Sequence, residues 1–296
     1  MNSLERTLTA DRGRYIGLAY RMLGSRTDAE DILQDAYLKA GQLGESNVQN
    51  EEAFLVTMVT RLCLDLLKSA RVRREVYVGP WLPEPILDAE QLTPEDANEL
   101  ADDLSFALMM TLEKLSASER ASFLLHDVFD TPFARIAQVL GKNEATCRQL
   151  AARARKSIQS ARTGTRASQE VHQTLLLQFA EAARTGDTIA LEKMLAEDAI
   201  AYTDGGGQIN AALRPIFGAD KVTRLFVGLA RKHLPRLEAI EMSIHSINGQ
   251  PGLILKIDGV VDQTITLDVV DEKIRAIYVV RNPRKLEAID RSDIAN

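Results

Sequence analysis

The chain contains 296 residues, 45% of them hydrophobic and 26% charged, and its formal net charge is −6. This composition is typical of a soluble globular protein with two or three domains. The acidic balance argues against a protein that coats nucleic acid non-specifically, although it leaves room for one focused basic face.

Neither a membrane segment nor a metal site is expected from the sequence. No apolar run approaches the roughly 18 residues that a membrane span needs, and the N-terminus lacks a basic-then-apolar signal. Cys63 and Cys147 fall on apolar helix stripes and lack metal-ligand spacing. We therefore expect a cytoplasmic protein with two small core cysteines, no metal, no cofactor and no membrane contact.

The first 78 residues are predicted to be helical. Thr27–Glu30 has the pattern of a capping box that opens a helix. The predicted buried stripe of this helix consists of Ala29, Ile32, Leu33, Ala36, Tyr37 and Ala40. Its opposite side carries Asp28, Asp31, Gln34, Asp35 and an exposed Leu38. Such an acidic ridge with one apolar side chain suits a basic protein partner, or it is simply a solvated helix face.

A second long helix is predicted from Glu51 to about Arg73. Its C-terminal part gathers five basic residues, namely Arg61, Lys68, Arg71, Arg73 and Arg74. They either compensate the helix dipole or form a nucleic-acid-binding surface.

A proline-rich segment, Gly79–Pro85, follows this helix. Three prolines in six residues exclude a helix and favour extended geometry, and they flank Trp81, the single tryptophan. A tryptophan in a rigid linker suggests insertion into a pocket. The stretch 84–119 then holds ten acidic residues and one lysine, a net charge of 1 − 10 = −9. It indicates a solvated linker, or alternatively a segment that shields a basic surface in a resting state.

The segment Phe133–Ile158 is predicted to form a helix-turn-helix. Gly141 makes the turn and Asn143 can cap the second helix. Along the second helix, Cys147, Leu150, Ala151, Ala154 and Ile158 form a continuous apolar stripe, and Arg148, Gln149, Arg153 and Lys156 lie on the other side. Arginine and glutamine are side chains that read guanine and adenine edges, so this pattern indicates DNA recognition.

The charge of this segment supports the same interpretation. Residues 133–166 contain eight basic residues and one acidic residue, a local net charge of +7. The alternative is a structural helical hairpin with a solvated basic face. A further capping box, Ser116–Glu119, predicts a helix that packs on the helix-turn-helix.

After about Arg166 the pattern predicts a compact α+β domain. Helices are expected at 171–185, 189–195 and over most of 213–233, and strands at 200–203, 238–247, 252–257, 263–270 and 274–280. Asn248–Gly249 and Asp271–Lys273 are natural hairpin turns, so the later strands should form an antiparallel meander. A curved sheet covered by helices often encloses an apolar pocket.

Several motifs resemble bacterial sigma-70-type factors. They are YIGLAYRMLGSRTDAEDILQDAYLKA, the basic stretch SARVRREVYVGPWLPEP, and FARIAQVLGKNEATCRQLAARARK. The WLPEP linker, Asp204–Gly207 and Asn282–Leu286 are similar to signatures of one subgroup, the extracytoplasmic-function (ECF) sigma factors with a C-terminal SnoaL-like domain. The resemblance spans nearly the whole chain.

This resemblance implies two all-α sigma domains followed by an α+β, cone-shaped SnoaL-like domain. Sigma domain 2 would occupy 1–78, an acidic linker 79–103, sigma domain 4 would occupy 104–163, and the SnoaL-like regulatory domain 168–290. The implied partners are core RNA polymerase and promoter DNA, and the implied function is promoter-specific transcription initiation rather than enzymatic catalysis.

The resemblance also assigns roles to residues. Core polymerase would bind Asp28, Asp31, Gln34, Asp35 and Leu38. The −10 element would be bound and opened by Asn47, Asn50, Arg61, Lys68, Arg71, Arg73 and Arg74, and the −35 element would be read by Thr146, Arg148, Gln149, Arg153 and Lys156. Regulatory contacts between domains would involve Trp81, Leu82, Pro83, Glu84, Pro85, Asp204, Gly205, Gly206, Gly207, Asn282, Pro283, Lys285 and Leu286.

In this subgroup the SnoaL-like domain is thought to act in place of a separate anti-sigma protein, packing on the sigma domains and the WLPEP linker. Two positions depart from the family pattern. Arg284 stands where aspartate is common, which could change a regulatory contact, and Cys147 stands where a small aliphatic residue is usual.

Three alternatives remain open from the sequence. The C-terminal domain could be a ligand sensor with a small molecule in its pocket, or a cyclase or isomerase using Tyr202, Asp204, His245, Asp258 or Asp262. No spacing singles out a catalytic pair among these residues.

The Gly205–Gly207 run is expected to be a tight turn that another segment's backbone approaches. A simple repressor would explain the helix-turn-helix but not the acidic ridge or the second basic surface.

Overall fold

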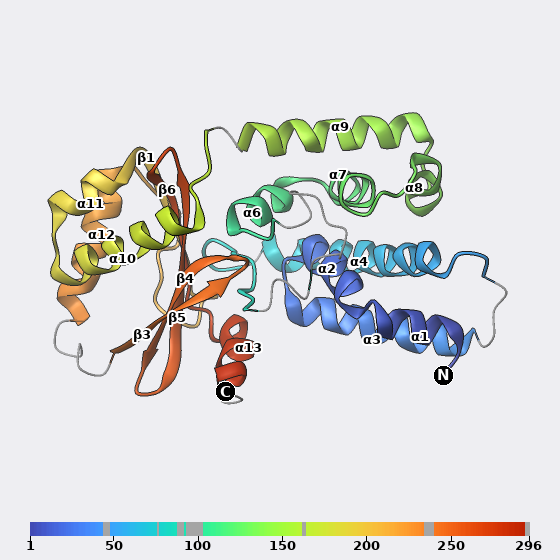
Figure 1. The fold of residues 1–296 in the computed structure, drawn as a ribbon, viewed down its shortest axis with the longest axis horizontal. Coiled ribbons are helices and arrows are strands. Elements are labelled where there is room, and N and C mark those ends of the chain that lie inside the picture. The colour runs from blue at the N-terminus through green and yellow to red at the C-terminus, as the bar shows by residue number, and fades with distance from the viewer. Residues whose placement is uncertain are drawn as a thin grey trace. The chain divides into compact units, whose positions relative to one another are not determined.

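The computed structural model describes residues 1–43, 48–75, 77–87, 92, 103–161, 164–233 and 240–293 (Figure 1). The chain divides into two compact units. The first comprises Met1–Val76, Asp88–Leu104 and Leu108–Arg162. The second comprises Tyr77–Leu87, Ser105–Ala107 and Thr163–Asn296. The proline-rich segment therefore belongs to the same unit as the C-terminal domain.

The first unit begins with four helices, one of which, α2, is central and buried. They are α1 (Ser3–Ala10), α2 (Arg12–Leu23), α3 (Arg26–Gln42) and α4 (Glu51–Glu75). Every residue of α2 from Tyr15 to Leu23 is buried, because α2 packs against both α3 and α4. Helices α1, α3 and α4 are amphipathic and cover α2.

The start of α3 corrects the predicted capping box at Thr27. The N-cap is Ser25, whose Oγ accepts a hydrogen bond from the backbone N–H of Asp28 at 3.1 Å. Ser25 has extended backbone geometry (φ −130°), the conformation in which a serine can cap, so the helix begins earlier than expected. The predicted stripe is buried except for Tyr37, which is partly exposed, and Leu38 is 58% exposed as expected.

The second half of the first unit contains the predicted helix-turn-helix. Its elements are α6 (Phe106–Lys114), α7 (Ala117–Phe123), the π-helix η2 (Leu124–Val128), α8 (Phe133–Leu140) and α9 (Glu144–Ala161). The Ser116–Glu119 capping box at α7 is confirmed. Gly141 ends α8 in the left-handed region at φ 62°, and Asn143 Oδ1 accepts from Thr146 N at 2.8 Å, so both predicted turn residues act as expected.

Arg120 joins the two helical halves of this unit. The side chain is buried on α7, donates to the carbonyl of Met22 at the end of α2, and pairs with Glu113. A buried guanidinium needs such partners, because an unpaired charge in the interior is costly.

The second unit is a six-stranded sheet with helices on both faces. The strands are β1 (Leu195–Asp204), β2 (Ile216–Phe217), β3 (Ile240–Ile247), β4 (Gln250–Ile257), β5 (Val260–Val270) and β6 (Lys273–Val280), in the order β2-β1-β6-β5-β4-β3. Figure 1 shows α10 (Gln169–Thr185), α11 (Thr188–Met194) and α12 (Ala219–His233) on one side and α13 (Pro283–Asp293) on the other.

The topology confirms the predicted meander and adds to it. Strands β3 to β6 run antiparallel, with Asn248–Gly249 at positive φ in the first turn. Strand β1 is longer than predicted and joins β6 in parallel, so the sheet is mixed. The helix predicted over most of 213–233 is α12, which begins only at Ala219, and the preceding residues include β2. Helix α13 was not predicted.

The space between α10–α12 and the sheet is filled by side chains. The core cluster includes Leu176 and Phe179 from α10, Phe226 from α12, and Leu253 and Leu267 from the sheet. Phe179 and Phe226 meet edge to face with ring centroids 4.9 Å apart. Among the helices that the structure describes, none is long and apolar enough to cross a membrane.

A buried histidine makes the stability of the second unit depend on pH. His172 on α10 is buried, and its Nε2 has no hydrogen-bond partner among the described residues. Burial lowers the pKa of His172 to about 4, because the charged ring would lose its hydration. When the pH falls below the pKa that His172 has in the unfolded chain, the unfolded chain binds a proton at this side chain and the folded chain does not.

We therefore predict that the free energy of unfolding falls on acidification and that His172→Leu weakens this dependence. Between about pH 7 and about pH 5, His172 should account for about 2 kcal/mol of the loss. Urea unfolding of both proteins at each pH measures this difference. Parallel stability profiles for the wild type and the variant would contradict it.

Candidate functional site

The exposed face of α9 carries the side chains predicted to read DNA. Arg148, Gln149, Arg153 and Lys156 are exposed and Thr146 is half-buried. The opposite face holds the predicted buried stripe from Cys147 to Ile158. The helix therefore presents polar and basic groups on one side while its other side packs on the domain.

Two of these arginines are held in place by neighbouring side chains. Arg148 Nη2 lies 2.7 Å from Glu144 Oε2, and its guanidinium lies 5.4 Å from the centre of the Phe133 ring. Arg153 Nε donates to Glu119 Oε1 at 2.7 Å, and hydrogen bonds from Ser116 and Arg153 lower the pKa of Glu119. Exposed pairs of this kind contribute at most about 1 kcal/mol, so a phosphate or a base can replace the carboxylates.

The predicted −10 surface on α4 is only partly described. Asn50 caps α4, with Oδ1 accepting from Ala53 N at 2.8 Å. Arg61 Nη2 donates to the Gln138 carbonyl of α8 at 3.1 Å, and Lys68 pairs with Asp65 in an exposed position. Asn47 and the side chains of Arg71, Arg73 and Arg74 lie outside the described residues.

The predicted polymerase-docking residues share one exposed face of α3. Asp31, Gln34, Asp35 and Leu38 are exposed, and Asp28 is half-buried in the first turn. Acidic side chains thus surround one exposed leucine on an otherwise solvated face.

In the second unit, a completely buried carboxylate lies at the end of β1. Asp204 is 0% exposed. Its Oδ1 accepts hydrogen bonds from Tyr77 Oη at 2.6 Å and from Gly206 N at 3.0 Å. Its Oδ2 accepts from Leu82 N at 2.9 Å and from Lys285 Nζ at 2.7 Å. Four donors from separate stretches of the chain therefore compensate one buried negative charge.

The ammonium group of Lys285 connects this carboxylate to the proline-rich segment. Lys285 Nζ lies 4.3 Å from the centre of the Trp81 ring and 5.1 Å from that of Tyr77, and it also donates to the Leu82 carbonyl. Asn282 Nδ2 donates to Tyr77 Oη at 2.8 Å. We call these residues, Tyr77, Trp81, Leu82, Asp204, Asn282 and Lys285, the Asp204 cluster.

Tyr77 remains a hydrogen-bond donor in this cluster. Burial raises the pKa of its hydroxyl well above the usual value, and the adjacent Asp204 carboxylate adds to the shift. A phenolate beside Asp204 would place two negative charges together.

The glycine run after Asp204 is a tight turn, as predicted. Gly206 and Gly207 have φ of 59° and 71°. A Cβ on Gly206 would lie 2.3 Å from Asn282 Nδ2, and one on Gly207 would lie 3.1 Å from Val78 Cβ. Only at Gly205 is the close group a backbone atom, as expected: a Cβ there would lie 2.1 Å from the Ile209 carbonyl oxygen, which belongs to the same turn. At Gly206 and Gly207 the close groups are side chains of other segments.

Two further contacts attach the linker ends to the sheet. Ile86 N donates to Asn248 Oδ1 at 3.0 Å, and Asn248 N donates to the Ile86 carbonyl at 2.8 Å. The Phe106 and Tyr278 rings stack at 5.5 Å between centroids. The motif residues Leu82, Pro83, Glu84, Pro85 and Leu286 are buried, Trp81 and Lys285 are half-buried, and Pro283 and Arg284 are exposed.

The polar residues considered for catalysis do not converge. Tyr202 stacks on Tyr278, and His245 lies on β3 with Nε2 at 2.9 Å from Ser243 Oγ. Asp258 is exposed in the β4–β5 turn, and Asp262 pairs with Arg281. In the described part of the chain, no group of three or more His, Cys, Asp or Glu side chains could hold a metal ion.

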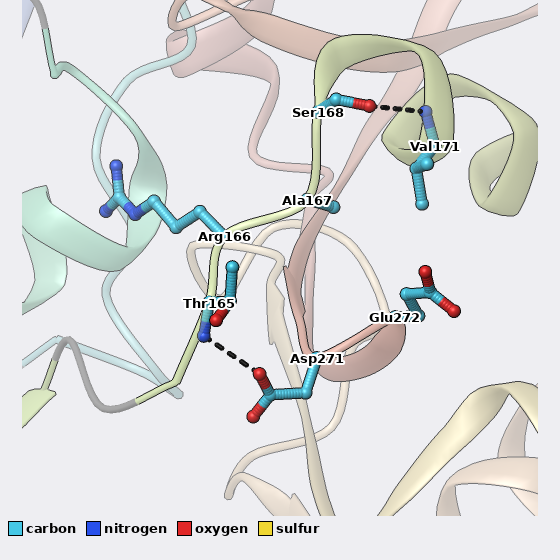
Figure 2. Close-up of a pocket in the computed structure, with 7 residues that line it drawn as sticks. All are labelled: Thr165, Arg166, Ala167, Ser168, Val171, Asp271 and Glu272. Carbon is cyan, nitrogen blue, oxygen red and sulfur yellow. Dashed lines mark hydrogen bonds between the residues drawn. The ribbon is translucent and has the colours of Figure 1, made fainter.

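One cavity of about 410 Å³ lies at the start of α10 (Figure 2). Its lining includes Ser168, Asp271 and Glu272. Figure 2 shows that two lining groups are already engaged: Ser168 Oγ accepts from Val171 N, and Asp271 Oδ1 accepts from Thr165 N. None of the residues considered for catalysis lines this cavity.

Comparisons with known proteins identify the family. Residues 8–73 match the family model for sigma-70 region 2, and residues 105–158 match that for sigma-70 region 4. The ECF RNA polymerase sigma factor SigJ of Mycobacterium tuberculosis is 35% identical over 283 residues, covering 93% of this chain and 90% of SigJ. The chain belongs to the ECF RNA polymerase sigma factors.

Further relatives agree. The probable ECF RNA polymerase sigma factor SigI of M. tuberculosis is 30% identical, covering 95% of this chain and 93% of SigI. The crystal structure of M. tuberculosis SigJ superposes with a TM-score of 0.74 at 33% identity, covering 95% of this chain and 97% of that chain. This sigma factor therefore directs promoter-specific transcription initiation, and its helical domains followed by an α+β domain confirm the predicted fold class.

The sequence did not reveal several residues around the Asp204 cluster. Tyr77 lies in the quoted stretch SARVRREVYVGPWLPEP and Asn248 in a predicted hairpin turn, but neither was assigned a contact with the linker or with Asp204. Ile86 and Phe106 belong to no motif that we recognised. The only available signal was the extended WLPEP segment, because a proline-rich chain without its own hydrogen bonds needs external partners.

We predict that Asp204→Asn destabilises the second unit by about 3 to 5 kcal/mol, because it leaves the Lys285 side chain, which is only 12% exposed, beside a neutral amide. Asp220→Asn is the matched control: Asp220 and its partner Arg224 are 70% and 68% exposed, and the change should cost at most about 1 kcal/mol. Urea unfolding measures both. Equal losses for the two variants would contradict the importance of the buried carboxylate.

Proposed function

We propose that this sigma factor binds core RNA polymerase through the exposed face of α3. Asp31 and Asp35 provide negative charge around Leu38, Gln34 adds a neutral polar group, and the exposed Leu38 side chain supplies an apolar contact. This arrangement supports docking to a basic protein surface, because charge guides the encounter and a desolvated leucine adds affinity.

Two helical surfaces would contact promoter DNA. The basic part of α4, with Arg61 and Lys68, would engage the −10 element, and α9 would enter the major groove at the −35 element. The support for α9 is its close apolar packing on one side and its exposed Arg148, Gln149 and Arg153 on the other.

The corresponding division of the chain places sigma domain 2 at 1–78, the linker at 79–103, sigma domain 4 at 104–163 and the regulatory domain at 168–290. The compact units of the structure group Tyr77–Leu87 and Ser105–Ala107 with the regulatory domain. Tyr77–Leu87 spans the boundary between the proposed sigma domain 2 and the linker, and Ser105–Ala107 lies at the start of the proposed sigma domain 4.

We further propose that the C-terminal domain restrains the sigma domains by holding these two stretches. The observation that carries the proposal is the Asp204 cluster, in which a buried carboxylate depends on donors from the linker for its compensation. Releasing the linker leaves Asp204 with fewer partners, so the bound state is favoured unless polymerase offers competing contacts.

For promoter reading, Arg148→Ala should cost about 1–3 kcal/mol of binding at one base position of the −35 element if Arg148 makes a bidentate contact. Binding of the holoenzyme to a series of singly substituted −35 sequences measures this. Arg184→Ala on α10, another exposed arginine paired with a glutamate, should leave the series unchanged. A loss spread equally over all sequences would instead mark Arg148 as a phosphate contact.

For regulation, we predict that Asp204→Asn raises transcription from a cognate promoter several-fold in a reconstituted assay with core polymerase. Tyr77→Phe, which removes one donor and costs about 1–2 kcal/mol, should raise it less. Because Trp81 is the single tryptophan, its fluorescence reports linker release as a shift to longer wavelength. Released Trp81 with unchanged or lower transcription would contradict the restraining role, and Asp220→Asn should change neither signal.

A further inference from the structure

The two edges of the sheet in the second unit differ in how they are protected. At one edge, β2 is only two residues long. At the other, β3 has eight residues and, among the described strands, pairs only with β4. A free edge presents unpaired N–H and C=O groups, and natural proteins usually protect it with short strands, lysine, proline or a bulge.

Strand β3 has none of these protections. Its sequence, IEMSIHSI, contains no proline, lysine or arginine. Its pairing with β4 runs in continuous register from Ile240↔Ile257 to Ile247↔Gln250, whereas other pairs of this sheet contain register shifts. A long, regular and weakly charged edge is suited to pairing with another strand.

The apolar face of the sheet extends onto β3, where part of it is exposed. Ile244 pairs with Leu253, which is buried in the core, and Met242 pairs with Leu255. Met242 is 50% exposed and Ile244 38% exposed. Apolar surface of this kind on the last strand gains burial when a further strand is added.

The hairpin geometry shows which groups of β3 point outward. The two-residue turn at Asn248–Gly249 makes Ile247↔Gln250 a hydrogen-bonded pair, and such pairs alternate along an antiparallel ladder. Ile240, Met242, Ile244 and Ser246 therefore direct their backbone groups toward the free edge.

A second copy of the chain can pair antiparallel with this edge in a register centred on Ser243 or on Ile244, and the side chains favour the first. In the register centred on Ser243, Met242 lies opposite Ile244 of the second copy. The backbone groups of both residues point toward the free edge, so these two residues form backbone hydrogen bonds and also an apolar side-chain contact. In the same register Glu241 lies opposite His245 of the second copy, a pair of complementary chemistry. A register centred on Ile244 would instead oppose Ser243 to His245 and Glu241 to Ile247.

We propose that β3 is a homodimer interface, in which two copies of this chain pair antiparallel about Ser243 to form one continuous sheet. The contact is isologous, as a two-fold axis through Ser243 requires. This proposal does not depend on the assignments of the DNA-binding residues.

Ser243→Cys tests the register directly in the full-length protein. The two substituted positions would form a non-hydrogen-bonded pair, with Cα atoms about 4.5 Å apart, within the range of a disulfide. Glu241→Cys is the matched control, because its copies would lie four residues apart along the strand, roughly 13 Å. The native Cys63 and Cys147 are buried and should not interfere. We expect rapid covalent dimer formation by Ser243→Cys alone on mild oxidation.

Sedimentation equilibrium over a concentration series tests the dimer itself. Ile244→Lys should raise the dissociation constant roughly tenfold or more, because it places two like charges at the interface. Ile189→Lys, on exposed α11, is the control and should leave the dimer intact. Circular dichroism checks that both variants fold. A wild-type chain that is monomeric throughout, or a Ser243→Cys protein that cross-links no faster than Glu241→Cys, would overturn the proposal.

Discussion

The burial of one carboxylate, Asp204, sets the arrangement of the second unit. A fully buried charge is tolerated only when hydrogen bonds and an opposite charge compensate it. Here the compensation comes from the linker through Tyr77 and Leu82, and from α13 through Lys285. The linker is therefore part of the C-terminal domain's own polar core, and its displacement leaves a charge without its partners.

The DNA-facing side chains obey different energetics. Arg148 and Arg153 are exposed, and their ion pairs with Glu144 and Glu119 are individually weak in water. They can exchange a carboxylate for a phosphate or a base at little cost, as recognition requires. The exposed arginines must change partners when DNA binds, and their weak ion pairs allow this. The buried Asp204 must keep its partners, because it has no water to replace them.

The sheet connects these properties to assembly. Strand β1 carries Asp204 near one end of the strand order, where β2 is short and the linker is bound, whereas β3 ends the order at the other side without protection. The linker also reaches the β3 side of the sheet, because Ile86 exchanges hydrogen bonds with Asn248 in the β3–β4 turn. A contact between copies along β3 would leave the Asp204 cluster on β1 untouched but would lie next to this second linker contact.

The sequence alone determined the family, the helix-turn-helix and most of the meander, because these follow from local signals. Helical periodicity, the Gly141 turn and the Asn143 cap act over a few residues, and hairpin turns set neighbouring strands. Only the tertiary structure decided the parallel β1–β6 pairing, helix α13 and the partners of Asp204. Tyr77 and Asn282 are separated by more than 200 residues in sequence, and their hydrogen bond exists only because folding closes that distance around a buried charge.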